Sequence, residues 1–241
     1  MYERPANTTN TMVESPRPVK PPLIELKCVS KVYENGAKVV ALSDIDLSFG
    51  EGEFAAIAGP SGSGKSTLLN IIGTIDSPSG GEVFFEGKRV SRLGENELAD
   101  FRLRSLGFIF QAYNLIPVLT AVENVEYVLV LQNAPRAERR PRALEALGRV
   151  GLLEQADRRP DLLSGGQQQR VAVARAIVHG PKVILADEPT ANLDSKTAQS
   201  LLDLMLGLNE KHGVTFIFSS HDQTVLKLAR RVIPIHDGKL S

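Results

Sequence analysis

The residue types best suited to chemistry lie in the stretch Gly59–Thr67, which reads GPSGSGKST. It follows an apolar run, Phe54–Ala58, that is typical of a buried strand, and leads into Leu68–Ile72, which is typical of the first turns of a helix. A strand that breaks into glycines before a helix leaves unpaired backbone N–H groups in one concavity, at the positive end of the helix dipole. The stretch therefore predicts a polyphosphate site, in which Gly59 and Gly64 permit a tight turn and close backbone approach.

Two side chains complete this expected binding loop. Lys65 would bring a positive charge to the β- and γ-phosphates, and Ser66 would place its hydroxyl on Mg²⁺. The alternative is a flexible Gly/Ser turn, which does not account for strand, glycine spacing, Lys-Ser pair and helix together. We predict a P-loop whose nucleotide-contacting residues are Gly59, Pro60, Ser61, Gly62, Ser63, Gly64, Lys65, Ser66 and Thr67.

Two acids follow a second apolar strand. The run Val183–Ala186 leads directly into Asp187 and Glu188. In a parallel sheet both acids would lie at the carboxyl end, beside the P-loop. Asp187 is placed to hold Mg²⁺ through its water shell, and Glu188 to orient or deprotonate the attacking water. The alternative is a pair of surface acids, which leaves unexplained why an apolar strand ends in two carboxylates.

Three single residues give weaker signals. Gln111 ends the short apolar strand Gly107–Phe110, where an amide reaches a metal or a water, or is simply solvated. His221 follows the expected strand Thr215–Ser219 and is placed to contact a γ-phosphate, although a lone histidine is more often a satisfied polar residue. Tyr33 suits stacking on a purine base, with a packed aromatic residue as the alternative.

A glycine-containing helix start forms a further candidate site in the sequence LSGGQQQR of Leu163–Arg170. Ser164 and Gln167 have the spacing of a capping box, so a well-capped helix is the simplest interpretation. Gly165 and Gly166 lower helix propensity, yet they clear the helix N-terminus so that an anion can approach its N–H groups. The pair of glycines therefore favours an anion site.

Composition limits the class of protein. The 241 residues suffice for one large domain with a subdomain, with 42% hydrophobic and 23% charged residues. Lys plus Arg and Asp plus Glu are 28 each, so no overall charge favours nucleic acid or anionic lipid. No apolar stretch reaches the roughly 20 residues of a membrane span, and the N-terminus lacks a signal-peptide core. We expect a cytoplasmic protein that neither binds nucleic acid nor inserts into a bilayer.

The elements that position these residues follow from periodicity and turn signals. Met1–Pro22 is polar and proline-rich, and is expected to be a disordered or extended tail. A turn is expected at Glu34–Gly36, and Asp194, in the loop Asn192–Asp194, is either an N-cap or a contact residue. Further strands are expected at 23–29, 39–49, 82–86 and 231–236, and helices at 95–104, from the capping box Thr120–Glu123, from Pro135 to about Arg149, and at 196–208.

Taken together, the motifs resemble the ATP-binding subunit of an ABC transporter, in order and spacing, over essentially Leu23 to the last residue. The resemblance rests on the P-loop, Gln111, the signature Leu163–Gln167, Asp187-Glu188, Asn192–Asp194 and His221. It implies an α/β fold: a P-loop NTPase (RecA-like) core with an antiparallel β subdomain and an inserted α-helical subdomain at about 92–163. It also implies ATP hydrolysis, with ATP and Mg²⁺ as cofactors.

Roles for the weaker signals are implied by the same resemblance. Tyr33 becomes the adenine-stacking residue, and Gln111 the metal- and water-contacting residue that reports to a membrane partner. Two copies would stack head to tail, and Asp194 would make a contact across the dimer. The signature residues Ser164, Gly165, Gly166 and Gln167 of one copy would close over ATP held by the other.

The segment Leu106–Asn124, together with Asn70–Gly73, looks most like the lipoprotein-release and macrolide-export branch of the family. This likeness implies an integral-membrane permease as partner and a location on the cytoplasmic face of the membrane. The aliphatic run Leu115–Leu119 is then expected to dock the permease, or else to fill the helical subdomain's own core. Departures from the branch are the proline-rich leader and Gln168.

Two alternative functions are open at this point. A soluble ABC ATPase acting on DNA or the ribosome usually carries a long coiled-coil insertion or two fused ATPase domains, for which this chain has no room. A nucleotide-binding module that switches without turnover would tolerate loss of Glu188 or His221, and both residues are present.

Overall fold

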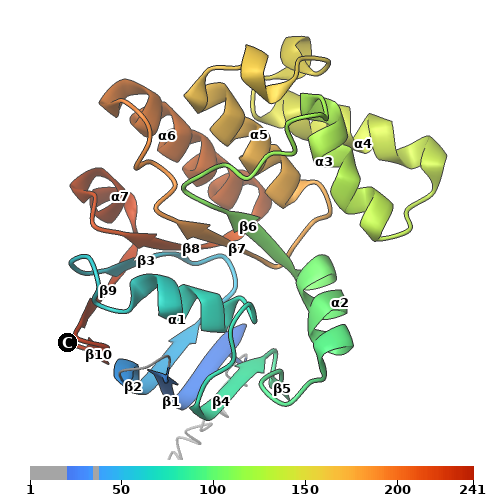
Figure 1. The fold of residues 1–241 in the computed structure, drawn as a ribbon. Coiled ribbons are helices and arrows are strands. Elements are labelled where there is room, and N and C mark those ends of the chain that lie inside the picture. Colours follow the sequence, from blue (N-terminus) through green and yellow to red (C-terminus); the bar gives the residue numbers. More distant parts are fainter. Residues whose placement is uncertain (1–20, 35–37) are drawn as a thin grey trace, which may run out of the picture.

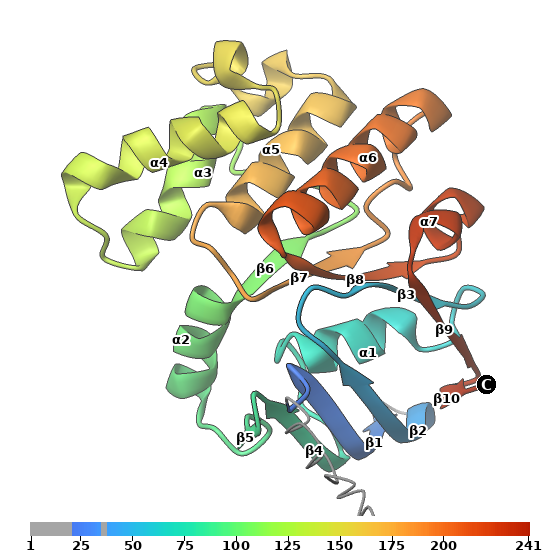
Figure 2. The ribbon, with the colours of Figure 1, turned by 180° about the vertical axis from the view of Figure 1, so that it is seen from behind.

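The computed structural model describes residues 21–34 and 38–241 (Figure 1). Most of the expected tail Met1–Pro22 lies outside the described residues, as do Asn35 and Gly36 of the expected turn. Within the described part, the strands form two sheets, and helices cover them (Figures 1 and 2).

The smaller sheet is antiparallel and has the strand order β2-β1-β4-β5. In β1, Ile24 pairs with Phe49 of β2 on one side and with Phe85 of β4 on the other. These side chains are buried, whereas many of their neighbours along the strands are exposed, so one face of the sheet is exposed to solvent. Its strands are β1 (Ile24–Tyr33), β2 (Val39–Phe49), β4 (Gly80–Phe85) and β5 (Lys88–Arg89).

The larger sheet is parallel except at one edge, with the order β10-β9-β3-β8-β7-β6 in the described chain. Every residue of β3 and of β8 is buried, because helices cover both faces of the sheet. The carboxyl ends of β3, β7 and β8 therefore open at the same sheet edge. Its strands are β3 (Phe54–Ala58), β6 (Leu106–Ile109), β7 (Val183–Asp187), β8 (Thr215–Ser220), β9 (Arg231–His236) and β10 (Lys239–Leu240).

Strand β3 separates two hydrophobic cores. Phe54 and Ala56 pack into the core beneath the later helices, whereas Ala55 and Ile57 pack into the core shared with the antiparallel sheet. The helix α1 lies between the two sheets, as Figure 1 shows. The helices are α1 (Lys65–Ile72), α2 (Glu95–Ser105), α3 (Ala121–Leu131), α4 (Arg136–Arg149), α5 (Gly165–Ile177), α6 (Ser195–His212) and α7 (Gln223–Leu228), with 3₁₀ turns at Leu153–Gln155 and Pro160–Leu162.

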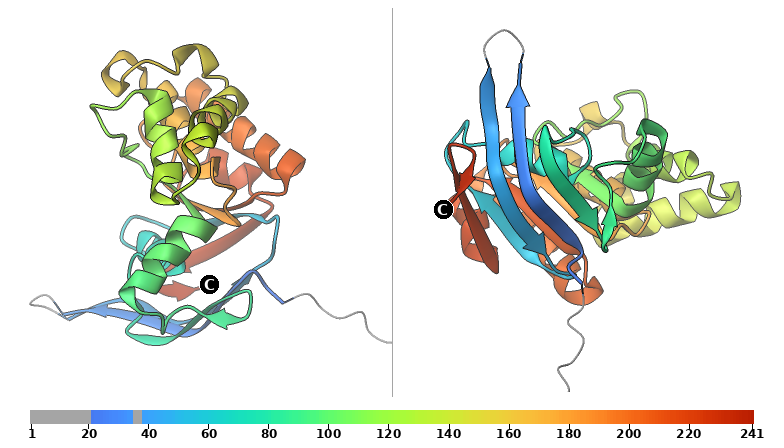
Figure 3. Two further views of the ribbon diagram at one scale, coloured as in Figure 1. Left: turned by 90° about the vertical axis from the view of Figure 1, so that its right-hand side faces the viewer. Right: turned by 90° about the horizontal axis from the view of Figure 1, so that it is seen from below.

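The helices α3 and α4 stand away from the sheets and pack against α5 (Figure 3). Both predicted capping boxes are present. The Thr120 hydroxyl accepts from the N–H of Glu123, whose carboxylate accepts from the N–H of Thr120. Ser164 and Gln167 make the same reciprocal pair. These caps fix where α3 and α5 begin.

The architecture has the expected parts, namely an α/β core, an antiparallel sheet and a group of helices. The expected helical range 92–163 also contains β6, which pairs with β7 in the larger sheet between α2 and α3. The helix α7 and the short strands β5 and β10 were not predicted, because each has too few residues to show a period.

Candidate active site

The P-loop needs its glycines for steric reasons. A Cβ on Gly59 would lie 2.2 Å from the carbonyl oxygen of Ile235 and 2.6 Å from the Ser63 hydroxyl oxygen. Gly64 precedes α1 with φ 104°, and a Cβ there would lie 2.7 Å from the carbonyl oxygen of Ala41. The loop is therefore packed closely against β2 and β9, and only glycine fits at these two positions.

The P-loop lysine and serine face the acids at the sheet edge. The Lys65 ammonium is buried, donates to the carbonyls of Gly59 and Pro60 at 2.9 Å each, and lies 3.9 Å from Glu188 Oε1. The Ser66 hydroxyl donates to Asp187 Oδ1 at 3.0 Å. An ammonium, a hydroxyl and two carboxylates thus converge beside the N-terminus of α1.

Glu188 and His221 form a pair directly after β7 and β8. Glu188 Oε1 lies 2.8 Å from His221 Nδ1, and the Ser220 hydroxyl donates to Glu188 Oε2 at 3.3 Å. The Glu188 backbone has a φ of 44°, and its N–H donates to the Ser219 carbonyl at 3.0 Å. The side chain of Glu188 is 16% exposed and that of His221 is 68% exposed, so the carboxylate is sheltered and the imidazole is open to solvent.

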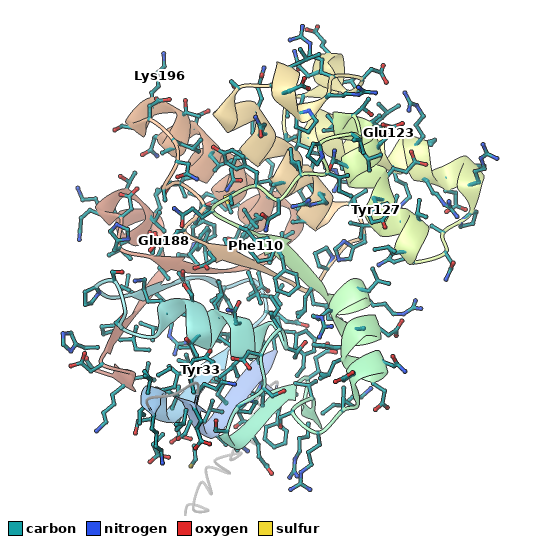
Figure 4. All side chains as sticks on the ribbon, viewed as in Figure 1. Tyr33, Phe110, Glu123, Tyr127, Glu188 and Lys196 are labelled. Atoms are coloured by element: carbon teal, nitrogen blue, oxygen red, sulfur yellow. The ribbon has the colours of Figure 1, made fainter. Side chains whose placement is uncertain are left out.

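One cleft of about 470 Å³ joins most of the predicted site residues. In Figure 4 the labelled side chains Glu188 and Tyr33 lie on opposite sides of α1. The cleft joins the Tyr33 ring, the P-loop and the pair Glu188 and His221, so it offers contacts for a base and for phosphates in one space. It is lined by Tyr33, Val39, Val40, Ala41, Ser61, Gly62, Gly64, Lys65, Ser66, Thr67, Gln111, Glu188, Ala191 and His221.

Tyr33 is held by a network that sequence reasoning missed. Its hydroxyl donates to Asp76 Oδ2 at 2.8 Å, and the Lys31 ammonium donates to Asp76 Oδ1 at 2.5 Å while lying 4.9 Å from the Tyr33 ring centroid. Burial and the bond to Asp76 raise the pKa of the Tyr33 hydroxyl. Burial also opposes ionisation of Asp76, but the bonds from Lys31 and Tyr33 outweigh it and lower the pKa of that carboxyl. Lys31 covers one ring face, so one face remains for stacking.

Several predicted residues do not line this cleft. Ser164, Gly165, Gly166 and Gln167 form the N-terminus of α5, where a Cβ on Gly166 would lie 2.3 Å from Cγ2 of Thr197. Asp194 caps α6 through the N–H groups of Lys196 and Thr197, and the Thr197 side chain lowers the pKa of Asp194. Both segments lie outside the cleft of their own chain. Gly59, Pro60 and Ser63 belong to the same loop but do not line the cleft.

Further residues at the site carried little signal. Ser219 donates to Asp187 and Ser220 to Glu188, and both end β8, so strand adjacency was the clue that could have found them. Val39 and Val40 are more than half exposed beside Tyr33, which suits an apolar base, but an exposed valine pair in a sequence has no distinctive pattern.

The donor set fits a magnesium ion. The Ser66 hydroxyl and the Asp187 carboxylate are in contact, and Gln111 lines the same cleft. These are hard oxygen ligands, and Mg²⁺ in nucleotide sites typically takes one or two protein ligands together with phosphates and waters. Accordingly, the described residues contain no cluster of three or more His, Cys, Asp or Glu side chains suited to a metal.

The combination of strand β3, a glycine loop, helix α1 and an acidic pair at the end of β7, a parallel strand of the same sheet, defines a P-loop NTPase. The family described as ABC transporter matches residues 42–191. An uncharacterized ABC transporter ATP-binding protein from Methanocaldococcus jannaschii is 50% identical over 219 residues, which are 90% of this chain and 97% of that protein. The chain belongs to the ABC transporter family and is its ATP-binding, ATP-hydrolysing component.

Other relatives place this component in a larger setting. The macrolide export ATP-binding/permease protein MacB of Wolinella succinogenes is 50% identical over 221 residues, which are 91% of this chain but 34% of that protein. The dimeric structure of the cassette MJ0796 has a TM-score of 0.84 at 46% identity and covers 90% of this chain and 96% of that one. A dimeric post-hydrolysis structure of the same cassette with ADP and Pi has a TM-score of 0.83 at 45% identity and the same coverage.

Proposed function

We propose that Glu188 is the general base for Mg²⁺-dependent hydrolysis of ATP in the cleft beside the P-loop. The observation that supports this is the convergence of Glu188, Lys65 and His221 at one sheet edge. Glu188 is sheltered, lies 3.9 Å from the Lys65 ammonium and contacts His221 at 2.8 Å. A carboxylate so placed accepts the proton of an attacking water, and His221, which is open to solvent, contacts the γ-phosphate.

The other cleft residues bind and orient the nucleotide. Backbone N–H groups of residues 59–67 and the Lys65 ammonium hold the phosphates, and the Tyr33 ring stacks on adenine. Mg²⁺ would be held by Ser66, by Asp187 through water and by Gln111, and when bound it neutralises charge on the β- and γ-phosphates.

Replacement of Glu188 by glutamine tests the assignment. Glu188→Gln keeps the shape of the side chain but not its basicity, so phosphate release should fall about 10²–10⁴-fold while ATP binding persists. Glu210→Gln, at an exposed glutamate of α6 paired with Arg230, is the matched control and should hydrolyse ATP normally. A Glu188→Gln protein with near-normal turnover would exclude Glu188 as the base.

A second copy of the chain completes the site in this proposal. Ser164–Gln167 and Asp194 lie outside the cleft of their own chain, and α5 presents a capped N-terminus with two glycines that suits an anion. The dimeric structure of the MJ0796 cassette supports the pairing of two copies, which we propose to be arranged head to tail.

Light scattering of the Glu188→Gln protein tests this assembly. The mass should double with Mg-ATP and stay that of one chain with ADP in the absence of phosphate, because ADP alone has no terminal phosphate for the second copy to contact. A mass independent of nucleotide would contradict the shared site. Ser164→Arg should abolish the doubling, since the larger side chain blocks the α5 N-terminus.

The partner in the membrane is proposed to be a permease of the export or lipoprotein-release type, with this chain on the cytoplasmic face. The described residues contain no helix whose length and apolarity would suit a membrane crossing. Support comes from the MacB protein, whose name joins an ATP-binding part and a permease, and from a second cleft of about 470 Å³. The relatives are transporter components, so a soluble ABC ATPase acting on DNA or the ribosome is not favoured.

The second cleft lies between α2, β6, α3 and α5 and has an apolar floor that includes Phe108, Phe110 and Val128. On α3, Tyr127 directly precedes the cleft residue Val128 and is 44% exposed, and Leu131 is 50% exposed; Figure 4 labels Phe110 and Tyr127. Such a surface suits an apolar or amphipathic helix.

The run Leu115–Leu119 divides between its two predicted roles. Leu115 packs against the core, whereas Val118 is 72% exposed and free to meet a partner. Val118→Glu should keep the thermal stability of the chain but prevent an integral-membrane protein from co-purifying with it from solubilised membranes. Val232→Glu, on the distant strand β9, is the control and should retain the partner. Retention by Val118→Glu would remove the run from the docking surface.

A further inference from the structure

The segment Phe110–Asn114, which carries Gln111 into the nucleotide cleft, pairs with no strand of the sheet in the described chain. Strand β6 ends at Ile109, and the backbone beyond it pairs with no neighbouring strand. Tyr113 and Asn114 have φ values of 57° and 52°, a left-handed conformation that asparagine tolerates but that is costly for tyrosine. Other contacts must therefore hold this segment in place.

Side-chain donors hold four of its carbonyls. The Gln169 amide donates to the carbonyl of Phe110 at 3.3 Å, and the Asn192 amide to that of Gln111 at 2.9 Å. The Arg175 guanidinium donates to the carbonyls of Tyr113 and Asn114, at 2.7 and 2.5 Å. The backbone of the segment is thus fixed mainly by residues of α5, the helix that begins with the signature.

Arg175 makes the strongest of these connections. Its planar guanidinium fork places two N–H donors at a fixed spacing, one on each of two successive carbonyls. Burial lowers the pKa of Arg175, and its guanidinium donates to these two carbonyls.

The Tyr113 side chain reaches the beginning of α5, where a Cβ on Gly165 would lie 2.9 Å from the Tyr113 hydroxyl. Tyr113 therefore contacts α5 at its first residue through its side chain and at its last turn through the bond from Arg175.

We propose that Arg175 is a positioning residue for ATP hydrolysis: it fixes the backbone of Tyr113 and Asn114 against α5 and thereby sets where Gln111 enters the nucleotide cleft. The proposal rests on the function assigned to Gln111 above. Arg175 and Asn114 also line the second cleft, so whatever occupies that cleft contacts the same bonds. Arg175 thus links the signature helix, the Gln111 segment and the proposed permease surface.

Removal of the guanidinium should impair turnover rather than nucleotide affinity. In Arg175→Met, kcat should fall about 10- to 100-fold, the cost of displacing a reacting group by about 1 Å, while KM for ATP changes less than about threefold. Arg142→Met is the matched control, because Arg142 of α4 donates to a backbone carbonyl, that of Val178, without touching the Gln111 segment. It should leave kcat within about twofold. Equal losses of kcat in both variants would overturn the proposal.

A double-mutant cycle separates positioning from a general loss of structure. If Arg175 acts through Gln111, then Arg175→Met in a Gln111→Ala background should change kcat less than about twofold. Multiplying effects would overturn the proposal. If Arg175→Met does not fold, Arg175→Lys takes its place, and it should retain one carbonyl bond and show an intermediate kcat that is likewise lost in the Gln111→Ala background.

The experiments distinguish a wrong role for Arg175 from a wrong role for Glu188. A Gln111→Ala protein with unchanged kcat would remove Gln111 from the site, and this inference with it. The Glu188→Gln measurement would still decide whether the cleft is the site of hydrolysis.

Discussion

The Tyr33 ring offers a direct measure of how the cleft binds a base. Lys31 lies 4.9 Å from the ring centroid on one side, so a base can stack only on the other. One base–aromatic stacking contact is worth about 1–3 kcal/mol. Tyr33→Ala should therefore weaken ATP binding about 5- to 150-fold. Tyr33→Phe keeps the ring and should weaken it less than about threefold, because a partly exposed hydrogen bond lies at the low end of the range, about 0.5 kcal/mol.

Calorimetric titration of ATP in the Glu188→Gln background measures these affinities without turnover. Tyr127→Ala removes an exposed tyrosine from α3, outside the cleft, and should bind ATP normally. The ATP affinity of Asp76→Ala should lie between those of Tyr33→Phe and Tyr33→Ala, because the substitution removes the bond partner of both the Tyr33 hydroxyl and Lys31. Because the pKa of Asp76 is lowered, its carboxylate keeps its bonds to Tyr33 and Lys31 at any pH above the usual pKa of an aspartate. These bonds are lost only when the pH falls below that value. ATP binding by Tyr33→Ala as tight as that of the parent would refute the stacking argument.

Three further predictions concern stability. Gly59→Ala should lower the free energy of unfolding by about 1–3 kcal/mol in urea titration, because its Cβ would overlap the Ile235 carbonyl oxygen, and an unchanged midpoint would contradict this. Asn124→Ala should lower the free energy of unfolding by about 1–3 kcal/mol, because the buried Asn124 amide donates to the Ile116 carbonyl and accepts from the Ile116 N–H. Thermal unfolding measures this, and a stability equal to that of the parent would contradict it. Burial lowers the pKa of His179, so the unfolded chain binds more protons than the folded chain, and the free energy of unfolding should fall as pH drops below about 6.5. The urea midpoint of His179→Gln should depend less on pH than that of the parent. An identical pH dependence would exclude His179 as the cause.

The sequence allowed prediction of the parts of the site whose signal is local. The P-loop, the Asp187-Glu188 pair and the signature helix each combine a recognisable element with its flanking residues, and each forms where it was expected. The strand ends were also sufficient to place His221 next to Glu188, because neighbouring parallel strands end at the same edge.

Contacts between distant residues could not be predicted in this way. Lys31 and Asp76 are separated by 45 positions and have no spacing that marks a pair. Arg175 gave no signal either, because an arginine in an amphipathic helix is normally solvated, and its carbonyl partners belong to a segment 61 or more residues earlier. The strand β6 was itself predicted, but it lies within a range expected to belong to the helical subdomain. Its place in the larger sheet depends on its pairing with β7, which no local pattern indicates.

The left-handed backbone of Glu188 has a consequence for engineering. A non-glycine residue at a φ of 44° carries an unfavourable conformational energy on the order of 1–3 kcal/mol, which the surrounding bonds must offset. Glycine or asparagine would adopt this conformation more easily. A library screened only for heat resistance should therefore accumulate these residues at position 188 and lose catalysis as it gains stability. Directed evolution of this chain towards robustness needs a simultaneous screen for turnover, because at this position the two properties favour different amino acids.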